Sequence, residues 1–128
     1  MVEKKKIIYT DRAPQAIGPY SQAVRSGNLI FTSGVIPINP VTGELVIGGI
    51  RDQADQAFVN LIELIHAAGA EAEDVVKTTV FIKNMDDFNA VNEIYEKYFT
   101  HSFPARSCVE VSRLPKGVLI EVEAIIAK

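Results

Sequence analysis

The C-terminal run from Phe103 to Ala127 constrains the fold more than any other part of the chain. It reads FPARSCVEVSRLPKGVLIEVEAIIA, and its apolar and polar residues alternate. Alternation with a period of two is typical of half-buried strands. The run therefore predicts two strands, Arg106–Ser112 and Val118–Ile126, which are joined by the loop Arg113–Gly117. The two strands could be direct neighbours, or the loop could step across an intervening strand.

The alternation also predicts which side chains share a face. On the second strand, four apolar residues form one unbroken face: Ile120, Val122, Ala124 and Ile126. On the first strand, Val109 and Val111 form the apolar face. Because a sheet buries only one face against its helices without leaving bare charges in the core, both apolar sets should face the helices. We therefore expect the remaining side chains together on the other face: Arg106, Cys108, Glu121 and Glu123.

This other face combines charges with apolar residues, because Leu119 and Ile125 lie among the carboxylates. A half-apolar sheet face is usually covered, and the predicted helices are already used on the opposite side. We expect a second copy of the chain to supply the cover. An arginine and a carboxylate in a cleft between subunits would then be candidates for a functional site.

The rest of the chain predicts two helices and further strands. Arg51–Ala68 carries an apolar stripe at helical spacing and ends before Gly69, and Asp86–Phe99 carries a second stripe. The predicted strands are residues 2–9, 21–26, 28–36 and 75–83. We expect an α+β fold in which two helices pack on one face of a mixed sheet of about six strands. We also expect residues 1–128 to form a single domain.

Composition excludes several classes of protein. The net charge is −3, with 16 acidic and 13 basic residues, so no basic footprint for nucleic acid is expected. Cys108 is the only cysteine and the chain has two histidines, which disfavours a disulfide framework and a metal site. No segment approaches the length of a membrane span. We expect a cytoplasmic protein without a metal site.

Several residues outside the C-terminal run are candidates for a site, each with an alternative. Tyr20 follows Gly18-Pro19 and could lie over a pocket mouth, or it could be a packed loop tyrosine whose hydroxyl bonds to backbone. Ser33-Gly34 interrupts an apolar strand, where glycine permits close approach of a ligand or of another strand. Asn92 falls on the apolar side of the second helix, so its amide needs partners. Those partners could be neighbouring backbone, or the amide could hold an arginine or a ligand.

Arg106 is the strongest single candidate. Its forked, permanently charged guanidinium suits a carboxylate ligand with two parallel hydrogen bonds. The alternative is an ion pair with Glu123 or Glu110, and the residues alone leave both interpretations open.

Four stretches resemble the RidA (YjgF, reactive intermediate deaminase) family and span nearly the whole chain. They are IGPYSQA, FTSGVIP, DFNAVNEIY and PARSCVEVSRLPKGVLIEVEAI. The resemblance implies a chorismate-mutase-like fold and a homotrimer with sites in the clefts between subunits. It implies hydrolysis of 2-imino acids, which pyridoxal-phosphate dehydratases release from serine or threonine, to 2-keto acids and ammonia without a cofactor.

The resemblance also implies roles for individual residues. Arg106 would clamp the substrate carboxylate, and Glu121 would relay protons to and from the attacking water. The backbone of Cys108 would help to place that water, whereas its thiol has no paired base in the sequence that would make it a nucleophile. The pocket would be lined by four further residues: Tyr20, Ser33, Gly34 and Asn92.

Two other functions compete with deamination. The same arginine could hold a 2-keto acid in a non-catalytic binding or chaperone-like module without turnover. Relatives have also been described as translation inhibitors or ribonucleases, although the acidic balance of this chain disfavours action on RNA.

Overall fold

The computed structural model describes residues 4–128. Its eight regular elements follow one another along the chain: β1 (Lys6–Ile8), β2 (Ala23–Ser26), β3 (Leu29–Thr32), α1 (Ile50–Ala67), β4 (Val75–Ile82), α2 (Phe88–Tyr98), β5 (Ala105–Glu110) and β6 (Ile120–Ala127). Three short 3₁₀ turns lie between them: Ala72–Asp74, Met85–Asp87 and Pro115–Gly117. The predicted strand 2–9 is shorter here, and its first two residues lie outside the described part of the chain.

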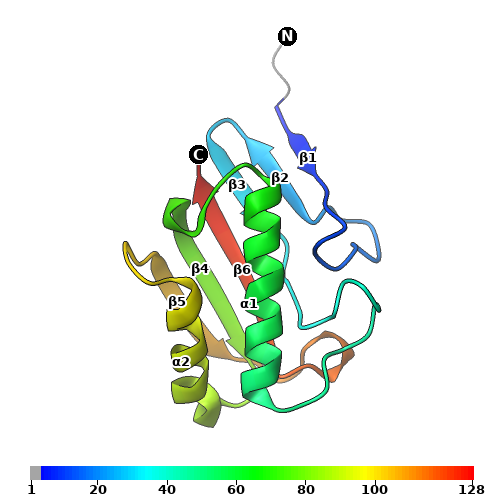
Figure 1. The fold of residues 1–128 in the computed structure, drawn as a ribbon, viewed down its shortest axis with the longest axis vertical. Helices are drawn as coiled ribbons and strands as arrows, with labels where there is room; N and C mark the ends of the chain where they lie inside the picture. The colour runs from blue at the N-terminus through cyan, green and yellow to red at the C-terminus, as the bar shows by residue number, and fades with distance from the viewer. Residues whose placement is uncertain (1–3) are drawn as a thin grey trace.

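The strands form one six-stranded sheet in the order β1-β2-β3-β6-β4-β5. Neighbouring strands are antiparallel except for β4 and β5, which are parallel and are connected through α2. Both helices lie on the same face of this sheet (Figure 1). The predicted architecture of two helices on a mixed six-stranded sheet is therefore confirmed. Strand β4 lies between the two C-terminal strands, so the loop between them does step across an intervening strand.

The core forms where α1 covers the centre of the sheet. The helix buries its predicted apolar stripe, including Phe58 and Leu61, against strands whose inward residues are fully buried. Strand β6 alternates strictly, with its four predicted apolar residues buried and its other residues partly exposed. Full burial of a side chain as large as Phe58 or Leu61 contributes about 1.5–3 kcal/mol to stability through the hydrophobic effect.

The predicted faces of the first C-terminal strand are wrong. Arg106 and Cys108 of β5 are paired with Thr78 and Val80 of β4, and both β4 residues are fully buried beneath the helices. Arg106 and Cys108 therefore lie on the helix-covered face. Val109, predicted to face the helices, is exposed.

Glu110 pairs with the buried Ile82, so it also belongs to the helix-covered side rather than to the outer face. Glu121 and Glu123 of β6 do lie on the outer face as predicted, because they alternate with buried Val122. Arg106 and Glu121 thus lie on opposite faces of the sheet in one chain.

The physical reason for this error is that β5 is an edge strand. It pairs only with β4, and the helix beside it is α2, which has 11 residues. At such an edge a long side chain can place its stem under a helix and still keep its charged end near water. The rule that a helix-covered face excludes charges holds for the centre of a sheet and fails at its border.

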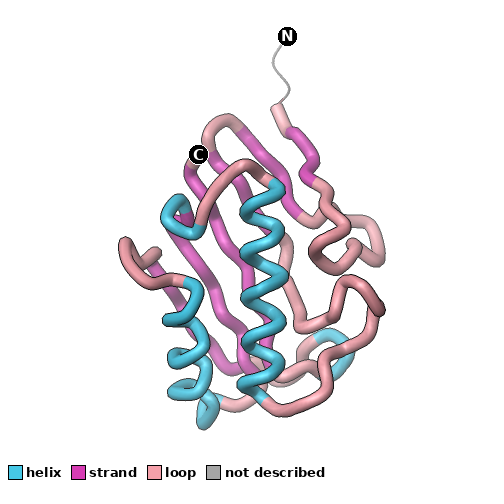
Figure 2. Tube along the Cα trace, in the orientation of Figure 1, coloured by secondary structure: helices cyan, strands magenta, loops and turns pink. Residues whose placement is uncertain are grey.

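The strand predicted over residues 28–36 ends early, at Thr32. After Ser33-Gly34 the chain rejoins β6 through a single bridge between Val35 and Val122. The long segment from there to α1 lies beside the loop that follows β1, next to α1 (Figure 2). These loops, rather than a continuous strand, build the surroundings of Ser33 and Gly34.

Candidate functional site

Three residues of α2 contact the guanidinium of Arg106. Its Nη1 donates a hydrogen bond to Oδ1 of Asn92 at 2.7 Å. Its central carbon lies 4.9 Å from the ring centroid of Tyr95 and 5.5 Å from that of Phe88. Cation–π contacts and the amide therefore fix the orientation of the fork. Of the two alternatives for Asn92, the structure shows the amide bonded to the arginine.

A cavity of about 340 Å³ lies at this arginine. It is lined by six residues: Asn92, Tyr95, Glu96, Phe103, Pro104 and Arg106. Within residues 4–128 no carboxylate lies within 4.0 Å of Arg106, so the predicted alternative of an ion pair with Glu123 or Glu110 does not form in this chain. The cavity can accept an anion beside the fork.

Cys108 lies on the same face as Arg106, two residues along β5. Burial raises the pKa of the thiol, and the positive charge of Arg106 offsets part of that increase. A thiol with a raised pKa is mostly protonated near neutral pH and is a weak nucleophile. The Cys108 thiol therefore lacks the lowered pKa that is typical of a nucleophilic cysteine.

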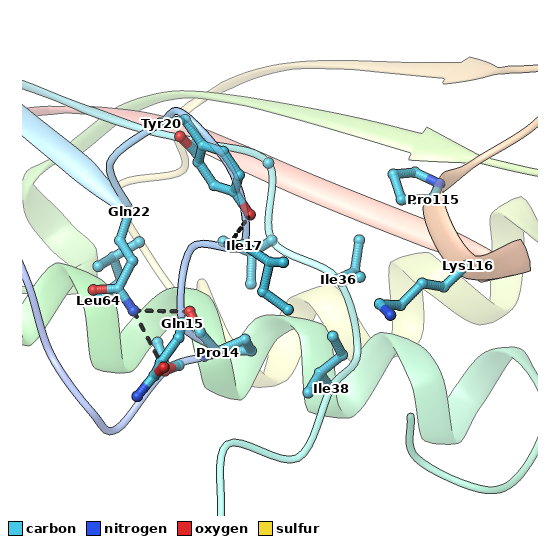
Figure 3. A pocket seen from close by; sticks show the side chains of 14 residues that line it. Pro14, Gln15, Ile17, Tyr20, Gln22, Ile36, Ile38, Leu64, Pro115 and Lys116 are labelled. Atoms are coloured by element: carbon cyan, nitrogen blue, oxygen red, sulfur yellow. Dashed lines mark hydrogen bonds between the residues drawn. The ribbon is translucent and has the colours of Figure 1, made fainter. Parts of the chain in front are cut away.

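Three other candidates line a second cavity, of about 210 Å³, among the loops beside α1. They are Tyr20, Ser33 and Gly34, and the remaining lining is largely apolar, with Ile17, Ile36 and Ile38 among it (Figure 3). The hydroxyl of Tyr20 accepts a hydrogen bond from the backbone N–H of Ile17 at 3.2 Å, while its ring lines the cavity. Tyr20 is 51% exposed, so it is not a packed loop tyrosine, although its hydroxyl bonds to backbone as that alternative requires.

The walls of this second cavity are fixed by polar contacts. Ser33 Oγ donates to the carbonyl of Ser21 at 2.6 Å. The buried amide of Gln22 donates to the carbonyls of Thr10 and Pro14, and its oxygen accepts from the N–H of Thr10. The loop between β1 and β2 is thereby held against the segment that carries Ser33.

Glu121 approaches this region from the outer face of β6. Its carboxylate lies against Gly34, so closely that a Cβ at position 34 would clash with it. Burial raises the pKa of the Glu121 carboxyl, and the neighbouring Glu123 raises it further. A carboxyl with a raised pKa can exchange protons closer to neutral pH than an exposed glutamate can.

The seven candidates thus fall into two groups. Arg106, Asn92 and Cys108 lie on the helix-covered side at the β5 edge. The others, Tyr20, Ser33, Gly34 and Glu121, lie around the Ser33-Gly34 segment, and the two cavities share no lining residue.

Sequence reasoning does not single out five residues around Arg106: Phe88, Tyr95, Glu96, Phe103 and Pro104. The sequence pattern places Phe88 and Tyr95 on the apolar stripe of the second helix and gives Glu96 no distinguishing feature. The signal was available, because Phe88, Asn92 and Tyr95 recur at helical spacings of three and four residues. An arginine that follows such a helix can lie across that face.

The part of the chain that the structure describes contains no group of three histidine, cysteine or acidic side chains placed to hold a metal ion. In the same residues, none of the helices is both long and apolar enough to cross a bilayer.

A family model and individual relatives match nearly the whole chain. Residues 10–128 match the family model described as Endoribonuclease L-PSP. A RutC family protein of Pyrococcus horikoshii is 54% identical over 124 residues, which cover 97% of this chain and 98% of that protein. A 2-iminobutanoate/2-iminopropanoate deaminase of Escherichia coli is 55% identical over 123 residues, which cover 94% and 95%.

Solved structures agree with the sequence matches. The crystal structure of Escherichia coli TdcF with bound serine superposes with a TM-score of 0.92 at 47% identity, covering 96% of this chain and 98% of that one.

Proposed function

This chain belongs to the endoribonuclease L-PSP family, also called the RidA or YjgF family, and on that premise we propose that it hydrolyses small 2-imino acids. Water adds to the imine carbon, the carbon–nitrogen bond breaks, and the products are a 2-keto acid and ammonia. The substrates named for the Escherichia coli and Dermatophagoides farinae relatives, 2-iminobutanoate and 2-iminopropanoate, support this substrate class.

The observation that carries the proposal is the oriented fork of Arg106 at an open cavity. Asn92 uses one N–H of the guanidinium, and the aromatic rings hold its plane. The remaining N–H groups are available for the two oxygens of a substrate carboxylate, which two parallel charge-assisted bonds would fix in place. Fixing the imine carbon next to a bound water supplies rate enhancement through positioning.

We assign the proton relay to Glu121 of a neighbouring copy in a homotrimer. Within one chain Glu121 and Arg106 occupy opposite faces of the sheet, so the second copy is a requirement of the mechanism. The outer face supports such an assembly, since both helices lie on the opposite face of the sheet (Figure 1) and exposed Phe31 is paired with Ile125 on the outer face. The raised pKa of Glu121 suits a group that takes a proton from water and returns it to the leaving ammonia.

The second cavity completes this model of the site. Tyr20, Ser33 and Gly34 would line the pocket around the apolar end of the substrate, next to Glu121 of the same copy. The backbone of Cys108 would help to place the water, because an edge strand such as β5 leaves part of its backbone N–H and C=O groups unpaired.

A coupled assay tests the function. A threonine dehydratase releases 2-iminobutanoate, and the protein should accelerate the appearance of 2-ketobutyrate. Arg106→Ala should reduce the acceleration about a hundredfold, because two charge-assisted hydrogen bonds are lost. Arg113→Ala, which removes an exposed arginine from the loop after β5, is the matched control and should match the parent. Equal rates for the parent and Arg106→Ala would refute the proposal.

The binding-module alternative makes a different prediction. It requires titration calorimetry to show 2-ketobutyrate bound through Arg106 while the coupled assay shows no acceleration by the parent. Action on RNA would instead require RNA binding that persists at elevated salt, which the net charge of −3 disfavours. A cytoplasmic location remains a prediction.

A further inference from the structure

The cavity beside Arg106 contains a carboxylate that the proposed mechanism does not use. Among its six lining residues Glu96 is the only acidic one. Glu121 cannot serve this cavity within the same chain, because it lies on the opposite face of the sheet. Glu96 is therefore the negative group that one copy of the chain itself supplies to the cavity lined by its own Arg106.

The helix α2 determines where Glu96 lies. It follows Asn92 by four residues, so both side chains lie on the same side of the helix, one turn apart. Asn92 contacts the guanidinium directly, at 2.7 Å. Glu96 thus lies one helical turn from the residue that touches the fork, on the rim of the same cavity.

The carboxylate of Glu96 is not used by another side chain. The four salt bridges of residues 4–128 involve other acids, and no side-chain hydrogen bond to Glu96 is present in that part of the chain. Its neighbour Glu93, by contrast, is paired with Arg51 of α1. Arg106 and Glu96 therefore face the cavity as separate charges of opposite sign rather than as an ion pair.

A protonated 2-imino acid matches this arrangement. It carries a negative carboxylate and a positive iminium nitrogen on adjacent carbons, whereas the 2-keto acid product carries the carboxylate alone. The protonated imine is also the stronger electrophile, because its carbon bears more positive charge. A carboxylate beside the nitrogen stabilises the cationic form through simple Coulomb attraction.

We propose that Glu96 binds the iminium nitrogen of the substrate while Arg106 holds its carboxylate, a role that rests on the proposed deaminase function. Glu96 keeps the imine protonated as water adds to the carbon. After ammonia leaves, the ketone oxygen of the product faces a negative group, which weakens product binding. Glu96 therefore distinguishes imine from keto acid and aids release of the latter.

Glu96→Gln tests the role, because it removes the charge and keeps the shape. In the coupled dehydratase assay, the protein concentration that gives half-maximal acceleration should rise about fivefold, the upper range for an exposed charge pair. Titration with 2-ketobutyrate should show affinity equal to or tighter than that of the parent. Glu96→Asp, which keeps the charge, should recover part of the activity.

Glu44→Gln is the matched control, since it makes the same charge change on an exposed residue outside both cavities. It should behave like the parent in both measurements. A Glu96→Gln chain as fast as an active parent would overturn the role of Glu96 alone. Equal losses of imine turnover and 2-ketobutyrate affinity would indicate a structural role and also overturn it. A parent without any acceleration would overturn the deaminase function, and this inference with it.

Discussion

At the scale of single residues, Gly34 determines where the Glu121 carboxylate can lie, because the missing side chain leaves room for it against the backbone. A Cβ at this position would meet the end of the Glu121 side chain and not backbone. The side chain of a glutamate is flexible, so it can move aside at little cost. The chain should therefore tolerate alanine at position 34 while the carboxylate is displaced.

We predict that Gly34→Ala lowers the free energy of unfolding by less than about 1 kcal/mol, within the ordinary range of point mutants, yet reduces acceleration in the coupled assay. Gly49→Ala is the control, because nothing lies within 4 Å of a Cβ at position 49. Urea unfolding and the assay measure the two effects separately. Full activity in Gly34→Ala would show that the position of Glu121 against Gly34 does not matter.

Glu121 should also leave a signature in the pH dependence of stability. Burial first, and then the nearby Glu123, raises the pKa of this carboxyl in the folded chain. The folded state then holds a proton that the unfolded state has already lost, so stability falls as pH rises from the ordinary glutamate pKa of about 4.3 to the folded value. Below that window both states are protonated and the penalty vanishes.

Glu121→Gln cannot ionise, so we predict that it is more stable than the parent at pH 7 and about equally stable at pH 4. Urea unfolding at both pH values measures the difference, with Glu44→Gln as the exposed control. If Glu121→Gln were instead less stable than the parent at pH 7, the raised pKa of Glu121 would be refuted, and with it the fit of this carboxyl to the proton relay.

Arg106 could be chosen as a candidate from its side-chain chemistry, which the sequence gives directly. The face of the sheet on which Arg106 lies depends on strand pairing, which the sequence indicates only through the hydrophobic pattern. Alternation and the rule of a single buried face predict that Val109 faces the helices, but on an edge strand the outer side can carry valine and the covered side arginine. The sequence lacked a signal for which strand would be the edge.

At the scale of elements, a contact between α2 and β4 fixes the position of Tyr95, whose ring lies against Arg106. The hydroxyls of Tyr95 and Thr78 form a hydrogen bond of 2.8 Å in the core. Burial raises the pKa of the Tyr95 hydroxyl, and Thr78 offsets part of this increase. The ring of the same tyrosine also lies against the guanidinium of Arg106.

We predict that Tyr95→Phe and Thr78→Val each cost about 1–3 kcal/mol, because each leaves a buried hydroxyl without its partner. The double variant should lose less than the sum of the two, since both hydroxyls are then absent. Denaturant unfolding of the four proteins measures the coupling. Tyr95→Phe should keep its activity because the ring remains, and strictly additive losses would contradict the proposed coupling.

Long elements with a strong periodic pattern were predictable. The first helix and strand β4 agree with their predicted ranges to within one residue, because each pattern is set by burial along the whole element. Strand β3 was predicted too long, since Ser33-Gly34 ends the regular pairing for reasons of local backbone geometry. The second cavity depends on loops such as residues 9–22, whose path follows from contacts like those of Gln22 and not from periodicity.

At the scale of the whole molecule, both helices lie on one face of the sheet, and within residues 4–128 no helix lies on the other (Figure 1). The bare face carries Phe31 and Ile125 next to the carboxylates of Glu121 and Glu123. Burial of such a face against identical copies would stabilise a closed assembly. In a ring of three copies, the Arg106 edge of one chain would meet the Glu121 face of the next, which one chain alone cannot achieve.

This arrangement predicts complementation between two inactive variants. Arg106→Ala lacks the fork and Glu121→Gln lacks the relay, so each protein alone should be nearly inactive. If every site takes Arg106 from one copy and Glu121 from the next, random mixing in equal amounts should make about a quarter of the sites intact in a cyclic trimer. The two proteins are unfolded together in urea, refolded, and tested in the coupled assay beside parent treated in the same way.

Recovery of about a quarter of the parent rate would support a shared site, because an intact site takes Arg106 from a Glu121→Gln copy and Glu121 from the adjacent Arg106→Ala copy. A site built within one chain would remain inactive in every mixture, since each copy carries one of the two defects. Mixing without refolding provides the control, because copies that do not exchange cannot form hybrid sites. Sedimentation of the refolded mixture must show the same assembled species as the parent, so an inactive mixture of intact trimers would exclude a site shared between Arg106 and Glu121.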